Sequence, residues 1–198
     1  EELIGLGVAY VPVDTTKDLA GQDVTAPERL DGLAYCPGSI NLKPFSRLAD
    51  EDFRSEWELN VLGAVRTLRL CLPALVHGDG ASIVMFSTVA AQVGMSFHAS
   101  IGSAKGAVEG LGRSLAAELA PKNVRVNLVA PSATDTPLAT RVLGNEKKKE
   151  ASAERHPLKR VGEPADQAAA AFYLLSPESG WMTGQVLRVD GGMSSVRG

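Results

Sequence analysis

The stretch HASIGSAK, residues 98–105, carries side chains that could move protons. Lys105 offers an ammonium group, and His98 has an ordinary pKa of about 6.5, which suits acid–base work near neutrality. Ile101 stands four residues before Lys105, so the two share one face of a helix. An isoleucine has no proton to give. The alternative for His98 is a loop histidine bonded to nearby backbone.

Two further polar residues could take part in the same chemistry. Thr88 follows an apolar run and supplies a hydroxyl that could polarise a carbonyl oxygen, although a strand-end threonine can equally be satisfied locally. Asn60 falls inside a predicted helix, where an asparagine is costly because its amide competes for backbone hydrogen bonds. Its position favours a functional amide or a bend in the helix.

The elements that would position these residues alternate along the chain. Short runs rich in β-branched residues alternate with longer segments of helical period, which indicates an α/β fold with a parallel sheet covered on both faces. We therefore predict a doubly wound sheet in three layers. The predicted strands are 8–14, 32–38, 82–87, 124–132 and 184–192, and the predicted helices are 50–76, 100–120 and 164–176, with Pro73 bending or shortening the first of these.

Composition limits the classes of partner. The 198 residues, 44% of them hydrophobic, fit one domain over 1–198, and the formal charge of −3 gives no basic field for nucleic acid or an anionic membrane surface. The acidic start is unlike a signal peptide, so we expect a cytoplasmic protein. Cys36 and Cys71 fit neither a disulfide framework nor a metal site, and we expect buried free thiols.

The segment 134–164 is long, polar and punctuated by proline. A segment of this kind is usually a mobile lid or a poorly ordered linker. The charge run 146–150 within it is typical of a solvated helix face.

From about residue 8 to residue 192 the order of features resembles the short-chain dehydrogenase/reductase family. Two long stretches carry the resemblance, RVNLVAPSATDTP at 125–137 and HPLKRVGEPADQAAAAFYLLSPESGWMTGQVLRVDGG at 156–192. The resemblance implies a Rossmann fold, and hydride transfer between NAD or NADP and a small carbonyl or alcohol substrate. It also implies a homo-dimer or homo-tetramer, with the two long helices at the interface.

The resemblance also implies roles for individual residues in binding the cofactor. Asp14 matches the acidic residue that meets the adenine, and Gly38 matches the glycine of a backbone turn beside the cofactor. Lys105 matches the lysine that holds the nicotinamide ribose. Pro131, Thr134 and Thr136 match the strand end and loop that touch the nicotinamide and the pyrophosphate, although Ser132 stands where the family prefers glycine.

Among the matched catalytic positions, one departs from the family. Asn60 matches the asparagine that anchors a relay water, Thr88 takes the place of the serine, and Lys105 that of the lysine. Ile101 occupies the position of the tyrosine that donates the proton. The loss of a positioned general acid costs about 10² to 10⁴ in rate. The resemblance therefore leaves two functions open, an oxidoreductase with an atypical active site and a non-catalytic relative that serves as a cofactor sensor or oligomer partner.

The first two strands of the family and the glycine-rich turn between strand and helix have no counterpart in the sequence. The GLG at 5–7 precedes a predicted strand and reads as a turn. We expect that the sequence omits an N-terminal part of a longer protein. The end of the second strand, which distinguishes NAD from NADP, is among the features without a counterpart.

Overall fold

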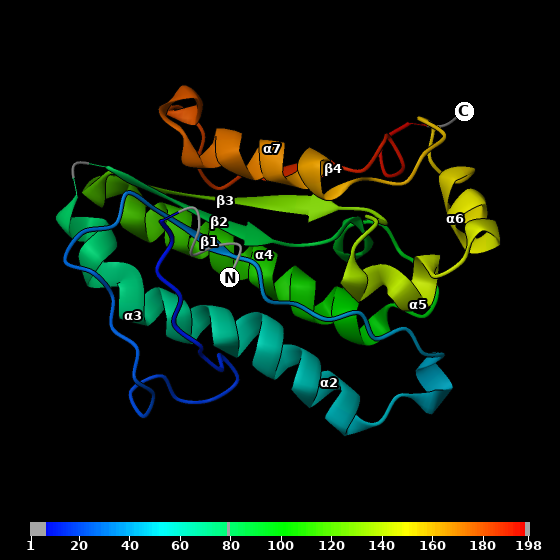
Figure 1. Cartoon of the computed structure of the whole chain (residues 1–198), viewed down its shortest axis with the longest axis horizontal. Helices are drawn as coiled ribbons and strands as arrows, with labels where there is room; N and C mark the ends of the chain where they lie inside the picture. Colours follow the sequence, from blue (N-terminus) through cyan, green and yellow to red (C-terminus); the bar gives the residue numbers. More distant parts are fainter. Residues whose placement is uncertain (1–6, 79, 197–198) are drawn as a thin grey trace.

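Four parallel strands form the centre of the computed structural model, which describes residues 7–78 and 80–196 (Figure 1). The strands lie in the order β1-β2-β3-β4. The central strands β2 and β3 consist mostly of buried side chains, as expected for a parallel sheet covered on both faces. Their bounds are β1 (Gly32–Tyr35), β2 (Ala81–Phe86), β3 (Val124–Pro131) and β4 (Val186–Val189).

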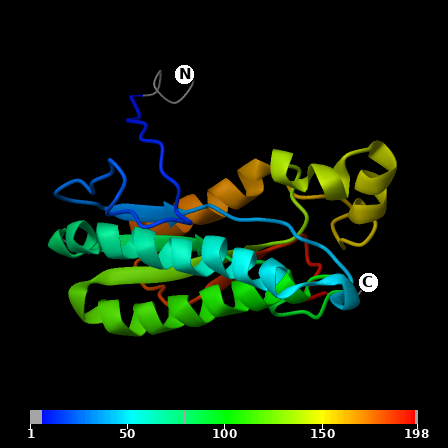
Figure 2. The ribbon, with the colours of Figure 1, turned by 90° about the horizontal axis from the view of Figure 1, so that it is seen from below.

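Helices cover both faces of this sheet. One layer holds a long helix, divided into α2, the π-helical turn η2 and α3, together with α4, which lies beside it (Figure 2). The other layer is α7, while α5 and α6 lie near the carboxyl ends of the strands (Figure 1). The bounds are α2 (Asp50–Trp57), η2 (Glu58–Leu62), α3 (Gly63–His77), α4 (Ala99–Leu119), α5 (Thr140–Leu143), α6 (Glu146–Ala153) and α7 (Pro164–Leu175), with short 3-10 turns at Phe45–Arg47, Val89–Ala91, Ala120–Lys122, Pro137–Ala139 and Pro177–Ser179.

The alternation of side chains along each strand divides the core in two. Ile83 and Met85 of β2 point toward α3 and α4, where the larger apolar cluster also contains Leu75 and Leu128. Val84 points the other way and packs with Leu174 of α7. The predicted three-layer α/β fold is confirmed.

The prediction of a strand over 8–14 is wrong. These residues have no regular structure, and Val8, Tyr10, Val11 and Val13 are exposed. The classical doubly wound order is 3-2-1-4-5-6, in which the third strand pairs only with the second. The resemblance makes 8–14 the third strand and β1 the fourth. The described residues contain neither the first nor the second strand of that order, so 8–14 has no partner for hydrogen bonding.

Smaller differences concern the first long helix. It begins with Ala49 at the cap position, whose amide donates to the Asp52 carboxylate at 2.9 Å. The helix runs through Pro73 to His77, so the proline does not shorten it. Its stretch Asp50–His77 has the length and mean hydropathy, 1.5, of a membrane span, and 44% of that window is buried inside the molecule.

The segment 134–164 is more ordered than a linker. It contains α5 and α6, and the charge run 146–150 forms the mostly exposed side of α6, as predicted. Of the two cysteines, Cys36 is exposed and Cys71 half-buried, so the expectation of two buried thiols is wrong. Gly7 has a φ of 76°, which fits the predicted turn, while residues 5 and 6 lie outside the described residues.

Candidate active site

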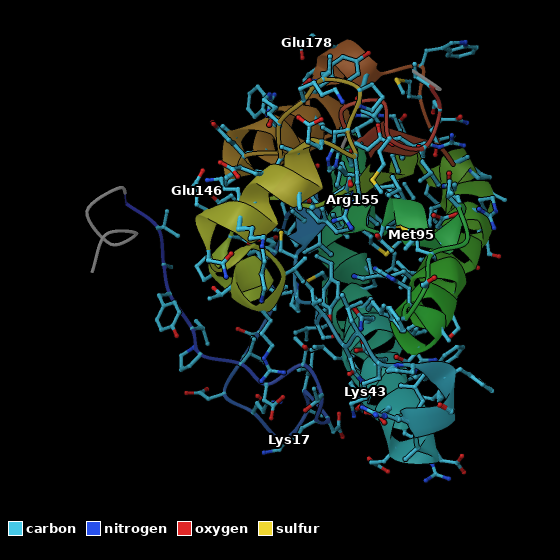
Figure 3. The ribbon with its side chains drawn as sticks, turned by 90° about the vertical axis from the view of Figure 1, so that its right-hand side faces the viewer. Lys17, Lys43, Met95, Glu146, Arg155 and Glu178 are labelled. Atoms are coloured by element: carbon cyan, nitrogen blue, oxygen red, sulfur yellow. The ribbon has the colours of Figure 1, made fainter. Side chains whose placement is uncertain are left out.

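The carboxyl ends of the four parallel strands share one edge of the sheet, the usual place for a ligand in such folds. Gly38 follows β1 by three residues, Thr88 follows β2 by two, and Pro131 ends β3. Figure 3 views the molecule from this side, with Met95 and Arg155 near its middle. The topology thus brings three of the sequence-predicted residues to one edge.

Lys105 reaches the same edge from α4. Its side chain is buried, with 7% of the residue exposed, and its Nζ donates to the carbonyl oxygen of Phe86 at 2.8 Å. Burial lowers the pKa of Lys105 to about 8, because the charged form loses solvation, while the negative charge of Glu56 opposes the fall. The ammonium therefore sits at the end of β2 and gives up a proton more easily than a surface lysine does.

Gly38, Asn60 and Lys105 converge on one point. A Cβ atom added to Gly38 would lie 3.4 Å from the Nζ of Lys105 and 3.5 Å from the Oδ1 of Asn60. The Oδ1 atom is buried and accepts no hydrogen bond from the described residues. An unpaired buried acceptor costs free energy, so this amide oxygen marks a place where a donor from outside the protein fits.

Asn60 owes its position to the π-helical turn η2. Its Nδ2 donates to the carbonyl oxygen of Glu56 at 2.9 Å, to the Oε2 of Glu56 at 2.9 Å and to the Oγ of Ser39 at 3.1 Å. Such turns inside α-helices often occur at functional sites. The predicted mid-helix irregularity at Asn60 is present.

Glu56 is a site residue that the sequence did not predict; it is 3% exposed and lies one turn before Asn60. Its Oε2 accepts hydrogen bonds from both Ser39 and Asn60. The only available signal was its spacing of four residues from Asn60, which puts the two on one helix face. Acidic residues at such positions usually face solvent, so that spacing alone predicted nothing.

Thr88 lies two residues beyond Phe86, whose carbonyl oxygen Lys105 contacts. The Oγ1 of Thr88 accepts from the amide of Ala90 at 3.3 Å and contacts the carbonyl oxygen of Pro131 at 3.5 Å. Both bonds are long, so the hydroxyl is only weakly held and can turn to another partner. Ile101 is 5% exposed and lies one helical turn before Lys105.

His98 is not brought together with the lysine. Its Nδ1 contacts the carbonyl oxygen of Ser96 at 2.7 Å, as the local alternative expects. The ring lines a separate hollow of about 280 Å³ with Phe45 and Phe97, and neither Thr88 nor Lys105 lines that hollow. The geometry therefore favours the loop role for His98.

The loop after β3 is held by its own contacts. The Oγ1 of Thr134 donates to the carbonyl oxygen of Ser132 at 3.1 Å and accepts from the Nε2 of Gln167 at 3.3 Å. Thr136 contacts the carbonyl oxygen of Thr134 at 3.5 Å. Ser132, where the family prefers glycine, bonds to the buried ring of His156 at 2.8 Å. The backbone of this loop is thus fixed against α7 and the end of α6.

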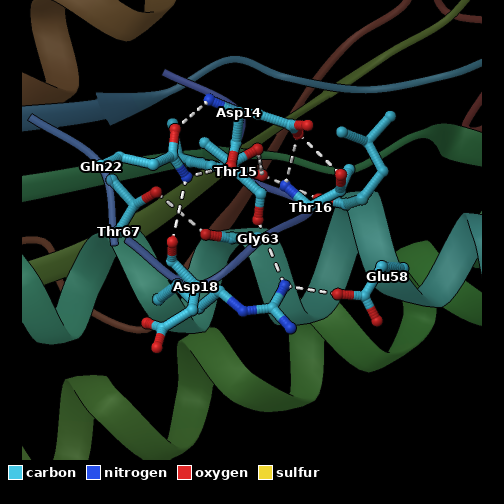
Figure 4. Close-up of polar contacts among 11 residues, drawn as sticks. Asp14, Thr15, Thr16, Asp18, Gln22, Glu58, Gly63 and Thr67 are labelled. Atoms are coloured by element: carbon cyan, nitrogen blue, oxygen red, sulfur yellow. Dashed lines mark hydrogen bonds and ion pairs between the residues drawn. The ribbon is translucent and has the colours of Figure 1, made fainter. Parts of the chain in front are cut away.

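Asp14 turns its carboxylate into its own loop (Figure 4). The Oδ1 accepts from the amide of Thr16 at 3.0 Å and from its hydroxyl at 2.6 Å, which lowers the pKa of Asp14. The loop is anchored on α3 through Arg66, which donates to the carbonyl oxygen of Thr15 at 3.2 Å and pairs with Glu58. The Asp14 carboxylate is therefore engaged locally rather than with the residues at the strand ends.

A comparison with known families agrees with this arrangement. A family model described as enoyl-(acyl carrier protein) reductase matches residues 6–194. The chain is also similar to a solved structure described as a short-chain type dehydrogenase/reductase from Mycobacterium ulcerans, with 32% identity and a TM-score of 0.83 over 96% of this chain and 71% of that one. The fold, the strand-end site and these matches define the class, and the chain belongs to the short-chain dehydrogenase/reductase family.

Curated relatives are similar over much of the chain. The chain is 36% identical to the peroxisomal 2,4-dienoyl-CoA reductase of Saccharomyces cerevisiae, over 75% of this chain and 51% of that enzyme. It is 31% identical to the 3-oxoacyl-(acyl-carrier-protein) reductase of Thermotoga maritima, over 91% of this chain and 72% of that enzyme. The chain thus spans about half the length of the yeast relative.

Proposed function

We propose that this chain belongs to an NAD- or NADP-dependent oxidoreductase that acts on a small carbonyl or alcohol substrate at the strand-end site. The observation that carries the proposal is the meeting of Lys105 and Asn60 at Gly38. A buried ammonium and an unpaired amide oxygen face the same point, 3.4 and 3.5 Å from where a Cβ of Gly38 would lie. Relatives with the names of reductases support the same class of reaction.

The residues present fit the nicotinamide half of the cofactor. Gly38 leaves room beside the Nζ of Lys105, and that ammonium can donate to ribose hydroxyls. Within 7–78 and 80–196 there is no glycine-rich turn between a strand and a helix, so among these residues the pyrophosphate half rests on Thr134 and Thr136. Asp14 would need to turn from its own loop to meet an adenine.

When bound, the nicotinamide supplies or accepts the hydride. The chain's own residues do the rest of the chemistry. Thr88 donates its hydroxyl to the substrate oxygen, and Lys105 holds the ribose and stabilises negative charge near that oxygen. The Oδ1 of Asn60 orients a water molecule next to the Nζ of Lys105. The buried apolar neighbour Ile101 keeps bulk water from the reacting atoms.

The proposal predicts the effect of Lys105→Ala on turnover. Removing the ammonium takes away both the ribose contact and the stabilising charge, so we expect the rate of ketone reduction to fall by at least about 10²-fold. Lys122→Ala, which removes a lysine from the exposed turn after α4, is the matched control and keeps the rate. Equal rates for the two variants, measured as NAD(P)H oxidation over a panel of ketones, contradict the proposal.

One observation favours the second candidate, a non-catalytic relative that senses the cofactor or joins an oligomer. Ile101 brings no proton donor to the position of the phenol. The two candidates differ in one measurement, because the sensor binds NAD(P)H but never oxidises it. We also propose a cytoplasmic homo-dimer or homo-tetramer, with no role in binding nucleic acid or membranes.

A further inference from the structure

Glu56 places a buried carboxylate in a helix whose other acidic side chains are mostly accessible. Asp50 and Glu51 in the same helix are exposed, whereas Glu56 is 3% exposed. Burying a charged carboxylate is costly unless it is paired and hydrogen-bonded. We therefore expect Glu56, which lies near Lys105, to act through its charge and its hydrogen bonds, which an apolar side chain could not provide.

The hydrogen bonds of Glu56 fix the orientation of Asn60. The Nδ2 of Asn60 donates to the Oε2 of Glu56 at 2.9 Å, and the hydroxyl of Ser39 donates to the same oxygen. A flipped amide would set its oxygen against the carboxylate, two acceptors facing each other. The Oδ1 of Asn60 is thereby held away from Glu56 and toward Gly38, where the Nζ of Lys105 also lies.

Two opposing effects act on the Lys105 ammonium. Burial disfavours its charged form, while the negative charge of Glu56 favours it. Burial raises the pKa of the neighbouring Cys36 thiol, so that thiol is uncharged near neutrality and leaves Glu56 as the charge that acts on the ammonium. The remaining contact is the carbonyl oxygen of Phe86. The opposing effects leave an ammonium that is mostly protonated near neutrality and that still releases its proton readily.

We propose that Glu56 is a positioning residue that prepares Lys105 as the proton source of the reduction, in place of the tyrosine that Ile101 replaces. The inference rests on the proposed function. In the step, an N–H bond of Lys105 breaks and an O–H bond forms on the substrate oxygen, by way of one water oriented by Asn60. The neutral amine left on Lys105 then takes up a proton from solvent. Lys105 supplies only the proton, and the electron pair on carbon comes with the cofactor's hydride.

The first test titrates Lys105 directly and needs no turnover. In protein with ¹³C-labelled lysine side chains, the resonance of Lys105 is the one lost in Lys105→Arg. Glu56→Gln keeps the hydrogen-bond acceptor but removes the charge. We therefore expect the pH at the midpoint of the Lys105 titration to fall by about one unit. Glu51→Gln removes an exposed carboxylate from the same helix and leaves the midpoint in place. An unchanged midpoint in Glu56→Gln overturns the proposal.

The second test follows the rate. The rate of ketone reduction falls as the pH rises through the Lys105 midpoint, because only the ammonium can donate. In Glu56→Gln this fall moves to lower pH by the same amount as the NMR midpoint, with KM for the ketone unchanged. A pH profile that does not follow the midpoint overturns Lys105 as the proton source.

The tests separate this inference from the proposed function. A protein that never oxidises NAD(P)H contradicts the proposed function. The midpoint of the Lys105 titration, measured by NMR, still shows whether Glu56 stabilises the charged form of Lys105. Ser39→Ala is a second variant in case Glu56→Gln fails to fold. It removes one donor to the carboxylate and weakens its charged form, so the Lys105 midpoint falls by a smaller amount, and no fall in either variant refutes the coupling.

Discussion

At the scale of single residues, Ile101 is the side chain on which the proposed chemistry depends most. The isoleucine is 5% exposed and lies one helical turn before the buried Lys105, so it brings no proton donor to the site and does not open it to solvent. The neighbouring Asn60 and Lys105 still meet at Gly38. A site with these residues in place should become more active when a proton donor is placed at position 101.

We predict that Ile101→Tyr raises the rate of ketone reduction by about 10²-fold, because a phenol placed beside the ammonium restores a positioned general acid. The measurement is steady-state NAD(P)H oxidation on simple ketones. Ile101→Phe is the matched control, since it adds the ring without the hydroxyl and should give no increase. If the tyrosine variant binds the cofactor yet reacts no faster than the phenylalanine variant, the remaining residues are not an intact site.

Gly63 is a second residue whose type the packing restricts, because a larger side chain would clash with Tyr35. A Cβ added there would lie 2.3 Å from the Oη of Tyr35, which donates to the carbonyl oxygen of Leu59 at 2.7 Å. We predict that Gly63→Ala lowers the free energy of unfolding by about 1–3 kcal/mol through overpacking. Gly110→Ala, at a helical glycine with open space, should raise it by about 0.5–1 kcal/mol. Urea unfolding that gives both variants the same sign contradicts the packing at Tyr35.

At the scale of elements, Asp52 ties α2 to the loop before it. Its carboxylate accepts from Lys43 at 2.5 Å, from Asn41 at 2.9 Å and from the amide of Ala49 at 2.9 Å. These bonds lower the pKa of Asp52 from 3.8 to about 2, with the hydrogen bond from Lys43 as the largest cause. A carboxyl whose pKa is depressed on folding stabilises the folded state above its unfolded pKa and loses that effect as the pH falls.

We therefore predict that the stabilisation from Asp52 is complete above about pH 4 and disappears as the pH falls toward about 2. Urea unfolding of the protein and of Asp52→Asn at pH 5 and pH 3 measures it, and the difference between them should shrink at the lower pH. Asp50→Asn, at an exposed carboxylate, is the control with no such change. A constant difference for Asp52→Asn contradicts the pairing.

The elements also show what the sequence can and cannot predict. The predicted helices 100–120 and 164–176 and the predicted strands 82–87 and 124–132 agree with the structure to within one residue at each end, because buried β-branched runs and a helical period are local signals. The strand at 8–14 failed because a strand needs a neighbour, which no local pattern supplies. The cap at Ala49 depends on the Asp52 side chain bending back, another contact that spacing alone did not specify.

The same distinction applies to the site. The family resemblance picks out Lys105, Asn60, Gly38 and Thr88 by their positions along the chain, and the structure brings the first three together. Glu56 could not be predicted, since its burial depends on the loop that brings Ser39 over α2.

At the scale of the whole molecule, the sheet and its covering helices place the candidate site at the edge formed by the carboxyl ends of the strands. α7 and β3 are joined by Arg125, whose Nη2 donates to the carbonyl oxygen of Ser176 at 2.9 Å and whose Nη1 donates to Ser179 at 2.7 Å. These bonds fasten the end of α7 to the amino end of β3, at the opposite end of the sheet from the candidate site.

The most direct measurement is a fluorescence titration of the protein with NADH and NADPH, repeated with Lys105→Ala. We predict saturable binding of at least one of them in the micromolar range, weakened by about tenfold or more in the variant, because the variant loses a charged contact to the ribose. Absence of binding to both, or equal binding to the protein and the variant, would contradict a cofactor site built on Lys105.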